Sequence, residues 1–216
     1  MPEDTPAGVS PPAPNPPTGP EESFIEEMIK LIKSSPGDRA NLKRNCGNDL
    51  AGARNCMWFY RLIRSNMRAE TCFLVATLMC TTRKDQTART ALAGESFGRT
   101  LTRIRSKRDG TDPIDRRFAI LLDASGDENA EGLLGSSELG FRLRQLVKLI
   151  DSQGHSIGWA QLLRDLNRWG HPTKWTQKAW ARDFYRPGES DQVDTDSNTA
   201  TPSTTAVGPA NGPVND

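Results

Sequence analysis

The sequence contains almost no histidine and none of the common catalytic or nucleotide-binding motifs. His155 and His171 are the only histidines among 216 residues, and each lies beside Gly or Pro at a predicted helix boundary. No P-loop, nucleophile elbow, HExxH or GxGxxG pattern occurs. Because no general base or metal cluster is assembled locally, the sequence predicts no catalytic residue, metal site, cofactor or small-molecule substrate.

Valine is also scarce in the central part of the chain. Between residues 23 and 188 there are 19 Leu and 9 Ile but only 2 Val, without a clear alternation of apolar and polar residues. Leucine favours helices, whereas β-branched valine favours strands. We therefore predict an all-α fold, a single elongated helical bundle of about eight helices. No targeting signal or membrane-spanning apolar run is present, so a cytoplasmic protein is expected.

Proline is unevenly distributed and divides the chain into three parts. Eight of the 15 prolines lie in residues 1–22, and residues 189–216 are almost wholly small or polar. Neither stretch can bury enough apolar surface to offset the entropy lost on ordering it. We predict disordered acidic tails at residues 1–22 and 189–216, on either side of one helical domain at residues 23–188.

Positive charge is concentrated in the predicted helical domain. All 28 Lys and Arg lie between Lys30 and Arg186, whereas 9 of the 27 Asp and Glu lie in the two tails. The domain therefore carries a net charge of +10, although the whole chain carries only +1. Such a surplus is typical of a surface that binds a polyanion. The alternative is a charge that serves solubility alone.

Apolar residues recur at helical spacing in a series of segments. The predicted helices cover residues 23–33, 39–45, 53–64, 69–80, 94–107, 114–123, 138–151, 159–169 and 174–185. Ser136 and Thr173 are the predicted N-caps of the helices that follow them. Residues 69–80 are apolar on nearly all sides, which predicts a central buried helix in which Cys72 and Cys80 pack as small hydrophobes.

Four of the five tryptophans lie between Trp159 and Trp180, in the last two predicted helices. Trp159 and Trp169 share an apolar stripe with three leucines, which predicts that these side chains pack in the core. The alternative is that the tryptophans are stacking platforms for nucleic-acid bases.

Residues of like charge repeat one helical turn apart in three predicted helices: Arg99 with Arg103, Arg144 with Lys148, and Arg164 with Arg168. Such pairs repel on an isolated helix, so they favour an external anion such as phosphate, which the planar guanidinium of Arg fits well. The alternative is a solvated face that is screened by salt or bridged by a carboxylate such as Asp165. Further neighbouring cations favour nucleic acid, namely Lys43 with Arg44 and Arg116 with Arg117.

Five short segments form one collinear series: GDRANLKR at Gly37–Arg44, FYRL at Phe59–Leu62, SFGRTL at Ser96–Leu101, IDRRF at Ile114–Phe118, and the tryptophan-rich Trp159–Phe184. This series, over roughly residues 24–185, resembles the CasB family, the small subunit of the type I-E CRISPR Cascade complex. The two tails match nothing in that family.

The resemblance implies a helical subunit that has no enzymatic activity of its own. Two copies line the RNA-guided complex, against its backbone subunits and near its large subunit, and help to hold guide RNA and target DNA, especially the displaced strand, in antiviral defence. Base pairing carries the sequence information, so the protein needs only backbone contacts. By position, the family's basic surface falls on Lys43, Arg44, Arg68, Arg99, Arg117 and Arg144, and the charge pattern adds Arg103 and Lys148.

Two other classes of protein stay open. A free-standing regulator of double-stranded DNA would need a recognition helix aimed at base edges, and no compact helix-turn-helix is evident. An enzyme such as a metal-dependent nuclease would need clustered histidines or carboxylates. The carboxylate pairs Asp112 with Asp115 and Asp165 with Asp183 are instead interpreted as helix caps and ion-pair partners.

Overall fold

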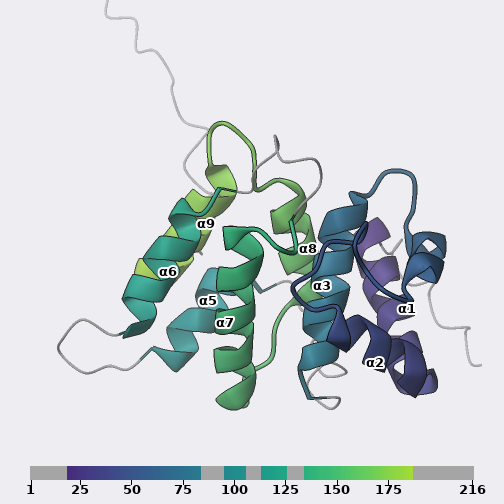
Figure 1. Ribbon diagram of the computed structural model, residues 1–216. Helices are drawn as coiled ribbons and strands as arrows, with labels where there is room; N and C mark the ends of the chain where they lie inside the picture. The colour runs from purple at the N-terminus through teal and green to yellow at the C-terminus, as the bar shows by residue number, and fades with distance from the viewer. Residues whose placement is uncertain (1–18, 84–94, 106–112, 126–133, 187–216) are drawn as a thin grey trace, which may run out of the picture.

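The computed structural model describes residues 19–83, 95–105, 113–125 and 134–186, and this part of the chain is helical (Figure 1). No strand occurs in it, and only an isolated β-bridge joins Cys46 to Asn48. The all-α prediction is confirmed. The elements are α1 (Pro20–Ser34), α2 (Pro36–Arg44), the 3-10 helix η1 (Met57–Leu62), α3 (Ala69–Thr81), α5 (Phe97–Ile104), α6 (Pro113–Asp123), α7 (Glu138–Ser152), α8 (Trp159–Asn167) and α9 (Trp175–Tyr185).

The helices form two groups that lie side by side (Figure 1). Helices α1, α2, α3 and α8 pack together in the first group, and α5, α6, α7 and α9 form the second. Contacts between α3 and α7 join the two groups. Helices that pack together are often distant in sequence: α1 packs on α8, and α5 packs on α9.

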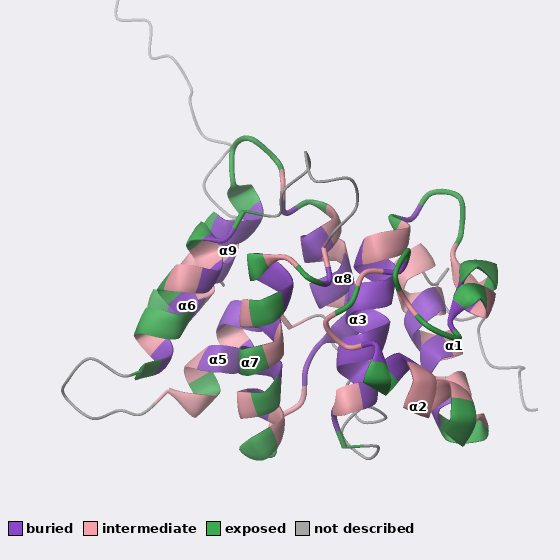
Figure 2. Cartoon of the chain, viewed as in Figure 1, coloured by how far each residue is buried: buried purple, intermediate pink, exposed green. Residues whose placement is uncertain are grey.

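Helix α3 is the buried centre of the first group, as the sequence predicts. Every residue of Thr71–Cys80 is buried (Figure 2). All four cysteines of the chain are free thiols. Burial raises the pKa of Cys72 and of Cys80 to about 12, so both thiols pack as neutral side chains. The prediction that these two cysteines pack as core hydrophobes is confirmed.

Three of the four C-terminal tryptophans pack in the core, which confirms the core interpretation for them. Trp159, Trp169 and Trp180 are buried. The Trp180 ring lies 5.0 Å from the Trp169 ring and 5.1 Å from the Phe97 ring, between centroids. Trp175 is the exception, with 37% of its surface exposed.

A buried hydrogen bond joins α8 to α9. Trp180 Nε1 donates to Asp165 Oδ2 at 2.6 Å, and Gln161 Nε2 donates to Asp165 Oδ1 at 2.8 Å. Burial raises the pKa of the Asp165 carboxyl, and these hydrogen bonds and two nearby arginines offset only part of that shift. The interpretation of Asp165 as a cap or ion-pair partner is therefore wrong: its principal partner is an indole N–H.

The predicted helix over residues 53–64 is wrong, since only η1 forms there. The Asn45 side chain donates to the Arg54 carbonyl at 2.9 Å and accepts from the Arg54 N–H at 3.1 Å. Asn55 then has a φ of 57°, in the left-handed region. These contacts hold the backbone outside helical geometry until Met57.

Several helix starts and caps also differ from the prediction: α2 begins at Pro36 rather than residue 39, and α5 begins at Phe97 rather than residue 94. Helix α1 begins at Pro20, so residues 20–22 of the predicted tail form its first turn. Ser137, rather than Ser136, caps α7 by accepting from the Gly140 N–H, and Lys174, rather than Thr173, precedes α9. The rest of the predicted tails, residues 1–18 and 189–216, lies outside the described residues. No helix among the described residues is both long and apolar enough to cross a membrane.

Candidate nucleic-acid interface

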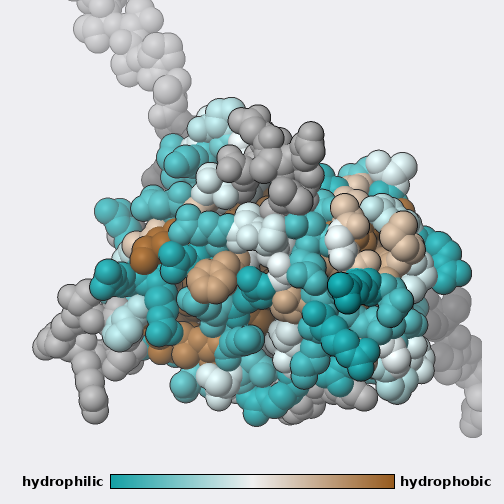
Figure 3. Space-filling view, viewed as in Figure 1, coloured by the Kyte–Doolittle hydropathy of each residue, from teal (hydrophilic) through white to brown (hydrophobic). Residues whose placement is uncertain are grey.

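Three of the predicted basic residues surround one open cavity of about 590 Å³ between α2 and α7. Lys43 comes from α2, and Arg144 and Lys148 come from α7. Cys46, Thr81, Phe141 and Gln145 complete the described lining, which contains no carboxylate. We call this site the basic cavity. The surface over α2 and the lower half of α7 is mostly hydrophilic (Figure 3).

The apolar pattern of each helix decides which side chains reach the basic cavity. In α7 the side chains of Leu139, Leu143, Leu146, Val147 and Ile150 are buried. Arg144 and Lys148 are one turn apart and lie on another side of that helix. In α2 only Leu42 is buried, which leaves Lys43 and Arg44 exposed at its C-terminal end. Cations at a helix C-terminus are also favoured by the helix dipole.

The Arg144 guanidinium rests against Gly47 in the wall of the basic cavity. A Cβ at Gly47 would lie 2.7 Å from Arg144 Cζ, so the guanidinium occupies the place of a side chain there. The guanidinium also lies over the Phe141 ring, 5.8 Å from its centroid. Gly47 has a φ of 108°, a conformation that side chains rarely adopt. Glycine is thus required both for the turn and for the position of Arg144.

Cys46 lies beside these cations and is half-buried. Burial raises the pKa of the Cys46 thiol, and the charges of Arg144 and Lys148 offset part of that rise. The thiol is therefore a neutral part of the wall rather than a reactive thiolate.

Arg44 faces a different cavity, on the other side of α2, also of about 590 Å³. The second arginine in its lining is Arg54, which the sequence pattern did not indicate because residues 53–64 were predicted to be helical and Arg54 has no basic neighbour one turn away. The lining also contains Asp49 and four asparagines, namely Asn41, Asn45, Asn48 and Asn55. We call this site the asparagine cavity.

The other four predicted residues line neither cavity. Arg68 and Arg117 are exposed, just before α3 and on α6 respectively, and Arg99 is half-buried on α5. Arg103 forms an ion pair with Glu95 at 2.8 Å. A role for these four residues in binding stays a prediction.

Internal contacts account for parts of the other two like-charge pairs. Arg164 pairs with Glu22 and donates to Gln161. Arg168 lies over the Trp175 ring, 5.4 Å from its centroid. In the part of the chain that the structure describes, by contrast, no ion pair forms at Arg144 or Lys148. Of the three like-charge pairs, Arg144 with Lys148 in the basic cavity therefore best fits an external anion.

Of the four carboxylates that the sequence places in pairs, Asp115, Asp165 and Asp183 have partners within the fold, and Asp112 lies outside the described residues. Asp115 pairs with Arg105 at 2.7 Å, and Asp183 accepts a hydrogen bond from Ser96. Among the described residues, no group of three or more His, Cys, Asp and Glu has the geometry to hold a metal ion.

The family model of CRISPR-associated protein Cse2 matches residues 38–185. Cse2 of Thermus thermophilus is 38% identical over 96 residues, which are 44% of this chain and 49% of that protein. The aligned stretch thus spans about half the length of this curated relative.

Solved structures with the same fold cover the chain more fully. CasB from M. ruber is similar at a TM-score of 0.61 and 29% identity, over 79% of this chain and 94% of that chain. CasB from Thermus thermophilus is similar at 0.56 and 25%, over 77% and 97% respectively. A chain from a CRISPR RNA-guided surveillance complex shares the fold at 0.62 and 21%, over 77% and 92%.

The predicted resemblance to CasB is confirmed by these matches, and the family model over residues 38–185 includes all of the five sequence segments except Gly37. The chain belongs to the family of CRISPR-associated protein Cse2.

Proposed function

We propose that this chain is a non-catalytic small subunit of a type I-E CRISPR Cascade complex, in which it binds the nucleic-acid backbone and stabilises the RNA-guided assembly. Its partners would be the guide RNA, both strands of the target DNA, the large and backbone subunits and a second copy of itself. The helical domain, residues 23–188, would carry this role. Family membership supports the proposal, as does the shared fold with a chain of a surveillance complex.

The observation that carries the proposal is the lining of the basic cavity. Lys43, Arg144 and Lys148 converge there without a carboxylate in the described lining. Converging cations without a carboxylate suit phosphate, which presents only acceptor oxygens and negative charge. A complex that reads sequence by base pairing needs such contacts and no base-specific ones.

Removing both lysines of the basic cavity should weaken target-DNA binding by the assembled complex. We expect Lys43→Ala with Lys148→Ala to lower affinity about tenfold at about 0.15 M salt, with a salt slope smaller by about 1.4–1.8, because two phosphate contacts are lost. Affinity should be measured by fluorescence anisotropy over a salt series, and assembly by size-exclusion chromatography.

The matched control is Lys33→Ala with Lys178→Ala, which removes the same charge from exposed positions on α1 and α9. Equal losses in the two double variants would contradict the assignment of the basic cavity. Sequence-specific binding of duplex DNA by the isolated protein would favour the free-standing regulator instead.

The contact between Gly47 and Arg144 makes a second, independent prediction. Gly47→Ala should lower DNA affinity about threefold, close to the effect of Arg144→Ala, because the new methyl group displaces the guanidinium. The double variant should then bind no more weakly than Arg144→Ala alone. Additive losses in this double-mutant cycle, measured by the same anisotropy titration, would show that Gly47 acts by another route.

A further inference from the structure

The asparagine cavity has no role in the proposed function, yet its walls are already fixed. The Asn45 side chain donates to the carbonyls of Asn41 and Arg54, both at 2.9 Å. The Asp49 carboxylate accepts from the Ser136 N–H at 3.1 Å and from its hydroxyl at 2.7 Å. Hydrogen bonds therefore hold the loop between α2 and η1 both internally and against the segment before α7. A preformed cavity loses little entropy when a ligand enters.

The size of the asparagine cavity fits a small organic ligand. Its volume of about 590 Å³ falls in the range of about 300–1,000 Å³ that is usual for small-molecule sites. Arg44 and Arg54 contribute two positive charges, and Asp49 contributes the only negative charge of the described lining. The net charge of the lining is thus positive, which suits one phosphate group.

The side-chain amides of Asn48 and Asn55 have hydrogen-bonding groups that a phosphate alone would not satisfy. The Asn55 side chain forms no hydrogen bond within the described residues, and Asn48 uses its amide group only to donate to Asn45 Oδ1 at 3.3 Å. An asparagine side chain presents both donors and an acceptor. A phosphate monoanion offers few donors to such acceptors, whereas a nucleobase edge offers donors and acceptors together.

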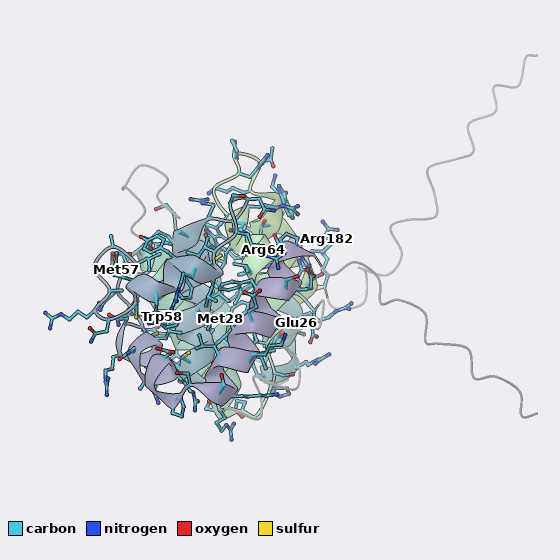
Figure 4. The ribbon with its side chains drawn as sticks, turned by 90° about the vertical axis from the view of Figure 1, so that its right-hand side faces the viewer. Glu26, Met28, Met57, Trp58, Arg64 and Arg182 are labelled. Atoms are coloured by element: carbon cyan, nitrogen blue, oxygen red, sulfur yellow. The ribbon has the colours of Figure 1, made fainter. Side chains whose placement is uncertain are left out.

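An aromatic side chain lies next to these amides. Trp58 Nε1 donates to the Asn55 carbonyl at 3.0 Å, which fixes the indole beside the rim of the cavity. Met57 of η1 is 68% exposed and is labelled at the edge of the molecule in Figure 4, whereas Trp58 is partly buried and packs against the core. Nucleobases that leave a helical stack commonly contact such apolar surfaces.

We propose that the asparagine cavity binds one unpaired nucleotide, with its phosphate at Arg44 and Arg54 and its base edge at the amides of Asn48 and Asn55. The inference rests on the proposed function, because Lys43 and Arg44 are consecutive and open onto the two cavities. A strand whose backbone lies in the basic cavity crosses the end of α2 and places a nucleotide in the second site.

The test compares single-stranded DNA with an abasic oligonucleotide of the same length, which has the same backbone and no bases. The full chain should bind the base-containing strand about tenfold more tightly in an anisotropy titration. Asn48→Ala with Asn55→Gly should remove this difference and leave abasic binding unchanged. Glycine at residue 55 keeps the positive φ, so the loop retains its shape.

Gln153→Ala is the matched control, because it removes an exposed amide at the end of α7, outside both cavities. Equal wild-type affinity for the two oligonucleotides would overturn the nucleotide site, and salt-dependent binding of both would leave the proposed function intact. Absence of binding to either oligonucleotide would overturn the nucleotide site, whereas the proposed function is overturned only by the titration of the assembled complex. A base preference that persists in the Asn48 and Asn55 variant would place base contacts elsewhere and overturn the assignment.

Discussion

Replacing Gly98 with alanine should destabilise the protein by about 2–3 kcal/mol, because α5 and α9 pack backbone against backbone at this residue. A Cβ at Gly98 would lie 3.0 Å from the Trp180 carbonyl carbon and 3.1 Å from its Cα. Backbone atoms cannot rotate away as a side chain can, so the two helices would separate. Separation would also loosen the contact between Phe97 and Trp180.

Thermal unfolding measures this effect directly. Because a loss of about 1 kcal/mol lowers the Tm of a chain of this size by about 2–4 °C, Gly98→Ala should lower the Tm by about 4–12 °C. Gly37→Ala in α2 is the matched control, since a Cβ there meets nothing within 4 Å. That control should be neutral or stabilising by up to about 1 kcal/mol, because alanine favours helix over glycine. A Gly98→Ala protein as stable as the control would contradict the close approach of α5 and α9.

Replacing Asp165 with alanine should cost about 2–3 kcal/mol of unfolding free energy, because it leaves the buried Trp180 N–H without an acceptor and creates a small cavity. Asp165 is 4% exposed, so water cannot replace the lost carboxylate. Asp165→Asn keeps an acceptor oxygen for Trp180 and should cost clearly less. Denaturant unfolding of the two variants measures the difference, and equal costs would show that the hydrogen bond to Trp180 contributes little.

A comparison of the wild type with Asp165→Asn tests the pH dependence of stability. The pKa of Asp165 is raised in the folded state, mainly by burial. Between the ordinary aspartate pKa and the raised value, the folded protein therefore holds a proton that the unfolded chain has released. The stability of the wild type relative to Asp165→Asn should fall as pH rises through this window and stay constant above it. A difference that does not change with pH would contradict the raised pKa.

Local periodicity was sufficient to predict most helices and the core. Helix α3 is predicted to within one residue because its apolar character is uniform, and the tryptophans of α8 and α9 lie on recognisable stripes. Two residues of the basic cavity, Arg144 and Lys148, stand out in the sequence for the same reason, since they are one turn apart on α7.

Contacts between distant residues account for what the sequence did not predict. The side chain of Asn45 ends the helical geometry around Arg54, and no local pattern indicates that contact. Arg164 pairs with Glu22, near the other end of the chain. The like-charge pair of Arg164 and Arg168 therefore did not indicate an anion site. Arg54 joins Arg44 only because a loop folds back over α2.

The pairing of α1 and α3 with α8, and of α5 with α9, has a consequence for biosynthesis. Neither group of helices can be completed until residues 159–185 have left the ribosome, because each group takes its last helix from that stretch. At a synthesis rate of about 5–20 residues per second, α1 therefore waits several seconds for α8, and α5 waits several seconds for α9. Truncation before Trp159 would leave both groups without their last helix, so their apolar faces would stay exposed.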